Sequence, residues 1–136
     1  MHCGLFSNEV MDHFINPRNA GDMDDPDGVG CSGDPDCGDH LIIYIKVRNK
    51  KIYDIRFLVY GCVAAIATSS MTTELAKGKS LEDALQLTDE DVIMALGDLP
   101  ENKIHCSLLG PTALKRAIEN YYEKIEEYKK CIAFKD

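Results

Sequence analysis

Three cysteines that lie far apart in the chain place the strongest constraint on how this sequence can fold. They are Cys37, Cys62 and Cys106, and two harder ligand candidates, Asp39 and His105, stand beside the first and the third. Thiolates favour zinc, copper(I) and iron–sulfur clusters, whereas a carboxylate and an imidazole make a site mixed and less tight than four thiolates. If these residues form one site, the fold must bring three distant segments together, and mixed ligation suggests that the site holds its contents temporarily.

The six cysteines do not fit a secreted domain held by disulfides. At 136 residues, 45% of them hydrophobic, the chain can bury a core without disulfides, and we expect residues 1–136 to form one domain. The first residues lack the pattern of a signal peptide, which favours a cytoplasmic location where thiols stay reduced. We expect no membrane association, because no stretch approaches roughly 18 consecutive apolar residues, and no nucleic acid partner, because the net charge is −8 without a basic cluster.

Hydrophobic spacing and turn residues divide the first half of the chain into a helix, a loop and two strands. Apolar residues at helical spacing over residues 7–15 predict a short helix that ends before Pro17. Residues 21–38 are rich in Gly, Asp and Pro and are predicted to form a loop. Two β-rich runs follow and predict a hairpin of strands, at 41–47 and 52–60.

The second half is predicted to be helical. Residues 64–77, rich in Ala, Ser and Met, predict a helix with Gly78 at its C-terminal end. Ser80 and Thr88 each precede an acidic turn and predict two more short helices. A long last helix is predicted over residues 107–131. Its apolar face contains Leu114, Ala117, Ile118, Tyr121, Tyr122, Ile125 and Tyr128. The order predicts an α+β domain in which a small antiparallel sheet of about three strands is packed on one face by helices.

Two of the cysteines are expected at helix starts. Backbone amides and the helix dipole at such a position lower the pKa of a thiol, so Cys62 and Cys106 are expected to be good ligands and nucleophiles. The alternative for any single cysteine is burial as a small apolar side chain. The candidate site has three cysteines and not the four that usually ligate the cluster of a permanent electron carrier, and the sequence lacks the paired C-x2-C spacing of structural zinc. His40 is a weaker substitute for Asp39, because neighbouring strand residues point to opposite faces.

Four stretches of the sequence carry more specific information. They are VMDHFINPRN (10–19), GDPDCGD (33–39), YGCVAAIATSS (60–70) and KIHCS (103–107). Together, in this order and spacing, they resemble the iron–sulfur cluster scaffold family that comprises IscU and the N-terminal domain of NifU. The resemblance covers nearly the whole chain.

The resemblance implies a scaffold that assembles [2Fe-2S] clusters from iron and persulfide sulfur and transfers them to apo-proteins, with no enzymatic turnover of its own. It implies that Cys37, Cys62 and Cys106 ligate the cluster and that Asp39 or His105 completes the shell. Asp39 would govern cluster lability, since a carboxylate is a poor partner for an iron–sulfide core. Cys106 would accept the persulfide sulfur.

The same resemblance implies a set of partners. A cysteine desulfurase and apo iron–sulfur proteins come first, followed by a ferredoxin, a frataxin-like protein, an Hsp70-type chaperone and a cluster-bridged homodimer. Two positions depart from the family pattern. Val63 replaces a usual glycine and adds bulk beside the second cysteine. The chaperone-recognition segment, usually Leu-Pro-Pro-Val-Lys, is LPENK at residues 99–103, which weakens the implication of chaperone assistance.

Two alternatives compete with the scaffold hypothesis. In a zinc-binding sulfur relay, Asp39, Cys62, His105 and Cys106, or Cys37 in place of one of them, would hold Zn²⁺ in tetrahedral geometry. A zinc hydrolase is disfavoured because the sequence has no H-E-x-x-H helix. Three further cysteines are interpreted separately. Cys31 is near enough to Cys37 in sequence to serve as an alternative ligand or a resolving thiol, but its turn-rich surroundings disfavour either role. Cys3 and Cys131 are interpreted as incidental thiols near the two ends.

Overall fold

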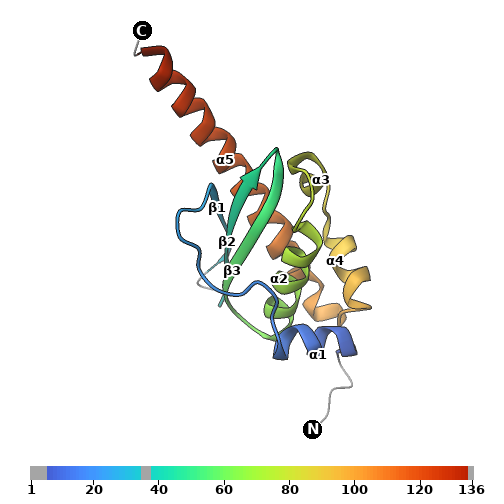
Figure 1. Cartoon of the computed structure of the whole chain (residues 1–136). Helices are drawn as coiled ribbons and strands as arrows, with labels where there is room; N and C mark the ends of the chain where they lie inside the picture. The colour runs from blue at the N-terminus through green and yellow to red at the C-terminus, as the bar shows by residue number, and fades with distance from the viewer. Residues whose placement is uncertain (1–5, 35–37, 135–136) are drawn as a thin grey trace.

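The computed structural model describes residues 6–34 and 38–134 (Figure 1). In chain order the elements are α1 (Asn8–Ile15), β1 (Gly28–Asp34), β2 (Asp39–Arg48), β3 (Lys51–Tyr60), α2 (Val63–Ala76), α3 (Leu81–Leu85), α4 (Asp89–Leu96), the 3-10 helix η2 (Glu101–Leu108) and α5 (Leu109–Phe134). The strands form one antiparallel sheet in the order β1-β2-β3. The predicted α+β class, with its small sheet and long last helix, is confirmed. Within the described residues, no helix is long and apolar enough to cross a membrane.

The predicted helix starts are confirmed by their caps. Ser7 accepts a hydrogen bond from the backbone N–H of Val10, and Ser80 caps α3 in the same way. Thr88 and Asp91 form a reciprocal capping box at the start of α4. Each cap satisfies amides that the first turn of a helix leaves unpaired. These polar residues therefore fix the helix boundaries that their sequence positions predict.

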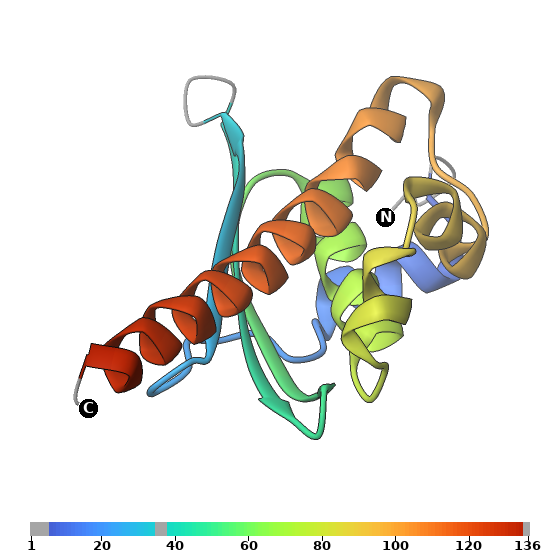
Figure 2. The same ribbon diagram turned by 90° about the horizontal axis from the view of Figure 1, so that it is seen from above.

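One face of the sheet carries the main core. The inward side chains of the central strand, Leu41, Ile43 and Ile45, are fully buried. They pack with residues of α2 and α5, which lie next to each other on this face of the sheet (Figure 2). The alternate residues of β2 and β3 point to the other face, where Leu58 and Tyr60 are exposed. The helices therefore cover one side of the sheet, as predicted.

The first strand was predicted to be a loop, and this prediction is wrong. The glycines that suggested a loop let α5 lie directly on the strand. A Cβ atom added to Gly28 would come within 2.3 Å of the carbonyl oxygen of Ala117, and one added to Gly30 within 2.2 Å of that of Ala113. Because the backbones of strand and helix touch, any larger residue would force them apart.

Helix α2 is buried on nearly all sides and contains many hydroxyl side chains. Ser69 and Thr72 donate to carbonyl oxygens four residues earlier in the same helix, over 2.7 Å each. These bonds satisfy hydroxyl groups that would otherwise be costly to bury. Helix α5 crosses α2 so closely that a Cβ atom on Gly110 would lie 2.0 Å from Thr72 Oγ1. This tight contact fixes the start of α5 against the second half of α2.

Candidate metal centre

Cys62 lies at the junction between β3 and α2. It is the N-cap residue of α2, with extended backbone angles of φ −79° and ψ 178°. Its side chain makes no capping hydrogen bond, so the thiol is not engaged with the helix it precedes. The predicted position just ahead of a helix is confirmed. The half-buried thiol is therefore free to contact groups from other segments.

Asp39 reaches the same place from the start of β2. Its carboxylate lies against Gly61, where a Cβ atom would be only 2.5 Å from Asp39 Oδ1. A side chain at position 61 would therefore displace the carboxylate. The glycine before Cys62 thus has a defined role, which sequence reasoning missed although it lies inside the Tyr60-Gly61-Cys62 motif.

Cys106 contributes the second described thiol. It was predicted to start the long helix, but it lies within η2, and α5 begins at Leu109. Thr68 of α2 donates a hydrogen bond of 3.1 Å to the carbonyl oxygen of Cys106, and Ser107 donates one of 2.6 Å to that of Ile104. The first bond fixes η2 against α2, and the second stabilises the turn within η2. Sequence reasoning did not predict this role of Thr68, although the residue lies inside the motif of residues 60–70.

The three side chains converge. Cys62 Sγ lies 3.9 Å from Cys106 Sγ, and Cys106 Sγ lies 3.7 Å from Asp39 Oδ2. One ligand atom from each residue falls within 4.8 Å of both others, the arrangement of a group that could hold a metal ion. Two soft donors and one hard donor suit zinc or iron better than magnesium or calcium. We call Asp39, Cys62 and Cys106 the ligand triad.

The electrostatics of the triad differ from the expectation of two activated thiols. The pKa of Cys106 is raised to about 12, mainly by burial and in addition by the neighbouring Cys62 and Asp39, against a smaller opposing effect of Lys103. Cys106 is only 1% exposed, so water cannot replace these interactions. The prediction of a lowered pKa is therefore wrong for Cys106 in the metal-free protein. A cation between the two sulfurs would relieve this repulsion and favour the thiolate.

His105 lies beside the triad without belonging to it. Its Nε2 atom is 3.7 Å from Cys106 Sγ, but the residue is exposed and does not join the mutually close set. The role of His105 as a ligand stays a prediction. His40 and Ile42 line a shallow hollow on the outer face of the sheet, so His40 is directed away from the core face. This is the orientation that strand alternation predicts.

The remaining cysteines are distributed over the molecule. Cys37 and Cys3 lie outside the described residues, so the ligand role of Cys37 is untested. Cys31 is exposed and pairs with Ile42 in the ladder between β1 and β2. Cys131 is exposed on α5. Among the described cysteines, Cys62 and Cys106 are the pair that the fold brings together.

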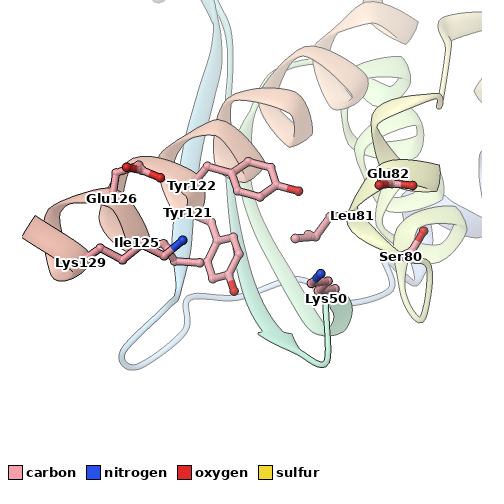
Figure 3. Close-up of a pocket in the computed structure, with 9 residues that line it drawn as sticks. All are labelled: Lys50, Ser80, Leu81, Glu82, Tyr121, Tyr122, Ile125, Glu126 and Lys129. Atoms are coloured by element: carbon pink, nitrogen blue, oxygen red, sulfur yellow. The ribbon is translucent and has the colours of Figure 1, made fainter.

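A separate hollow lies elsewhere on the surface, along the C-terminal half of α5. It has a volume of about 480 Å³ and lies between α5 and the segment around α3 (Figure 3). Its lining consists of Lys50, Ser80, Leu81, Glu82, Tyr121, Tyr122, Ile125, Glu126 and Lys129. None of the triad residues lines it, so this hollow and the candidate metal centre are separate features.

Comparisons with known proteins agree on one protein family. Residues 5–128 match the model of the NifU-like N terminal domain. The iron-sulfur cluster assembly scaffold protein IscU 1 of Archaeoglobus fulgidus is 56% identical over 120 residues, covering 88% of this chain and 78% of that protein. The iron-sulfur cluster assembly scaffold protein IscU of Escherichia coli (strain K12) is 46% identical over 125 residues, covering 89% of this chain and 97% of that protein.

Solved structures show the same fold at lower sequence identity. A putative iron-sulfur cluster assembly scaffold protein for the SUF system from Fervidobacterium islandicum aligns with a TM-score of 0.67 and 23% identity, over 84% of this chain and 96% of that one. A nitrogen-fixing NifU-like protein (N-terminal) from Brucella abortus aligns with a TM-score of 0.67 and 20% identity, over 88% and 96%. At these identities the likeness concerns the fold alone.

Proposed function

This chain belongs to the family of NifU-like N-terminal domains, and on that basis we propose that it is a scaffold on which iron–sulfur clusters are assembled before transfer to apo-proteins. The observation that carries the proposal is the convergence of Asp39, Cys62 and Cys106 from three distant segments. The triad combines soft donors that bind iron with a hard donor that binds it less well. Such a donor set suits a cargo that must be both held and released.

The distances in the triad suit ligands that share one tetrahedral metal ion. Two sulfurs that are each about 2.3 Å from one tetrahedral centre lie about 3.8 Å apart. The corresponding separations here are 3.9 Å between the two sulfurs and 3.7 Å between Cys106 Sγ and Asp39 Oδ2. We therefore propose that a first iron ion binds to the triad and that the cluster grows from it.

We propose a [2Fe-2S] cluster as the cargo, with Cys37, Cys62 and Cys106 as ligands and either Asp39 or His105 as the fourth. His105 is exposed and close to Cys106 Sγ, so its side chain can turn towards a cluster without unpacking the core. Asp39 is the weakest soft-metal ligand of the set, and we propose that it sets the rate of cluster release. Replacing it with alanine should slow release.

Cys106 is the proposed acceptor of sulfur. Its thiolate would attack the outer sulfur of a persulfide on a cysteine desulfurase, forming an S–S bond on Cys106 while the donor cysteine leaves as a thiolate. No oxidant or reductant is needed for this transfer. Because the pKa of Cys106 is raised to about 12 in the metal-free protein, little thiolate is present at neutral pH. We therefore propose that iron enters before sulfur.

A zinc-bound form is the second candidate, and the tetrahedral spacing of the triad favours it. In that form Zn²⁺ would occupy the place of the first iron, and the protein would relay sulfur without building a cluster. The partners of either form would be a cysteine desulfurase and a protein that receives sulfur or the cluster. Ferredoxin, a frataxin-like protein and an Hsp70-type chaperone belong to the same proposal.

Anaerobic reconstitution separates the two candidates. The protein is incubated with ferrous iron, cysteine and a cysteine desulfurase, and visible absorption and Mössbauer spectra are recorded. A [2Fe-2S] spectrum is expected for the wild type and for the control Cys131→Ser, whose thiol is exposed on α5. It should be lost in Cys62→Ser and Cys106→Ser. Retention of one tightly bound zinc ion without any cluster would reject the scaffold proposal in favour of sulfur relay.

A further inference from the structure

The C-terminal half of α5 carries an apolar face that other described residues cover only in part: Tyr121 packs against the main core, whereas Tyr128 and Ile132 are exposed. In the first half of the helix, Leu114 and Ile118 are buried against the sheet. The helix then runs beyond the end of the sheet (Figures 1 and 2), and the same face continues at spacings of four, three and four residues. We call this continuation the tail face. It consists of Tyr121, Ile125, Tyr128 and Ile132.

The tail face has the pattern of a coiled-coil seam. Apolar residues alternating at four and three positions form the line along which two helices pack. Tyr128 is 63% exposed and Ile132 50% exposed, although both continue a stripe that is buried further back. Beside the seam lie two hollows, of about 480 Å³ next to Lys50 and Tyr122 (Figure 3) and about 450 Å³ next to Pro26 and Tyr128. A second helix can therefore lie along the tail face.

We propose that the tail face binds the tail face of a second copy of this chain, with the two α5 helices antiparallel. One register pairs all four apolar residues of each copy. In it Ile125 faces Tyr128 of the second copy, and Tyr121 faces Ile132 of the second copy. Sliding one helix by seven residues towards the sheet would bring Ile118 into the interface, but Ile118 is buried against its own sheet. Sliding it by seven residues the other way would leave Tyr121 without an apolar partner.

The charges beside the seam select the antiparallel orientation. Lys124 and Lys129 flank the seam on opposite sides. In a parallel pair, residues five positions apart meet across the interface, so Lys124 would face Lys129 of the second copy. In the antiparallel register, Lys129 lies beside Tyr122 and Glu126 of the second copy, and Lys124 lies beside Glu127 of the second copy. Each lysine then meets an acid, and Lys129 also meets an aromatic ring.

The proposed dimer leaves both metal centres free. Cys106 precedes α5, whereas the tail face begins at Tyr121, about 18 Å further along the helix axis from its first residue. The association therefore requires no cluster and differs from a cluster-bridged homodimer. Four paired apolar positions per copy form a small interface compared with the roughly 1,200–2,000 Å² of a stable complex, so the dimer is expected to dissociate on dilution.

Analytical ultracentrifugation of the metal-free protein over a range of concentrations tests the proposal. The mass of the wild type should rise from 15.1 kDa towards twice that value. Tyr128→Glu should stay monomeric. The control Met94→Glu adds the same charge at an apolar residue of α4 that is 78% exposed, and it should behave as the wild type. Both replaced side chains are largely exposed, so circular dichroism should show an unchanged fold. A wild type that stays monomeric, or a Tyr128→Glu variant that associates equally well, would overturn the proposal.

A charge exchange tests the orientation separately. Glu126→Lys and Lys129→Glu should each associate about tenfold more weakly, because two favourable pairs become two repulsive pairs. An equimolar mixture of the two variants restores both pairs and should associate as the wild type does. If each variant associates normally, or if the mixture does not recover, the antiparallel register is wrong. Cys106→Ser should associate normally, and loss of association in it would replace this dimer with one bridged through the metal centre.

Discussion

Replacing Gly61 by alanine tests how the metal centre keeps room for its carboxylate. The added Cβ atom would lie 2.5 Å from Asp39 Oδ1 and 2.8 Å from Ala65 Cβ. Ordinary contacts begin near 3.5 Å, so the carboxylate must move by about 1 Å. Gly61 is not among the glycines with positive φ, so alanine can adopt its backbone conformation. The change therefore acts on Asp39 through side-chain crowding.

The expected loss of metal affinity follows from the displacement of one of the three triad ligands. Loss of a group that positions a metal ligand typically weakens metal binding by about 10–100-fold, which is about 1.4–2.8 kcal/mol. Crowding against Ala65 should also lower the free energy of unfolding by about 1–3 kcal/mol. We expect both effects in Gly61→Ala, with a loss of metal affinity no greater than that of Asp39→Ala, which removes the carboxylate outright.

Competition titrations of Zn²⁺ and anaerobic Fe²⁺ against a chromophoric chelator measure the affinity. Four proteins are compared: the wild type, Gly61→Ala, Asp39→Ala and the double variant. If Gly61 acts by leaving space for the carboxylate, the double variant should bind metal as tightly as Asp39→Ala alone. An unchanged affinity in Gly61→Ala, or the same loss in the presence and absence of Asp39, would refute this reasoning.

Three further predictions concern stability. Because the pKa of Cys106 is raised from 9.0 to about 12, unfolding releases its proton in this range, and the metal-free protein should lose stability as the pH rises from about 9 towards 12; denaturant titrations should show less of this loss in Cys106→Ser. Thr68→Val removes the donor to the Cys106 carbonyl and should lower the free energy of unfolding by about 1–3 kcal/mol, with weaker zinc binding in the same chelator assay. Gly30→Ala would place Cβ 2.2 Å from the Ala113 carbonyl oxygen and should lower the melting temperature more than Thr68→Val, whereas an unchanged melting temperature would contradict the tight strand–helix contact.

Local sequence signals predicted most of the helices and the hairpin. Ser80 and Thr88 fixed two helix starts because a cap depends on residues within one turn. The strand β1 could not be predicted in this way. Its glycines serve a contact with α5, more than 80 residues further along the chain, and local composition alone makes them look like turn residues. The missing information was a long-range contact.

For the candidate site, too, the sequence predicted some features and missed others. Residue chemistry and family motifs singled out Asp39, Cys62 and Cys106, and the fold brings them together. The raised pKa of Cys106 could not be predicted, because it depends on burial and on two neighbours from other segments. A helix start was expected to lower the pKa, but Cys106 lies inside η2 in a buried environment, where desolvation and repulsion act in the opposite direction.

The most direct test of the scaffold account is cluster transfer. A [2Fe-2S] cluster is reconstituted on the protein, an apo-ferredoxin is added, and circular dichroism in the visible range follows the cluster from one protein to the other. The account predicts transfer by the wild type and slower transfer by Asp39→Ala, because the triad then lacks its weakest ligand. A cluster that forms but never leaves the wild-type protein would contradict the account, and so would equal transfer rates for the two proteins.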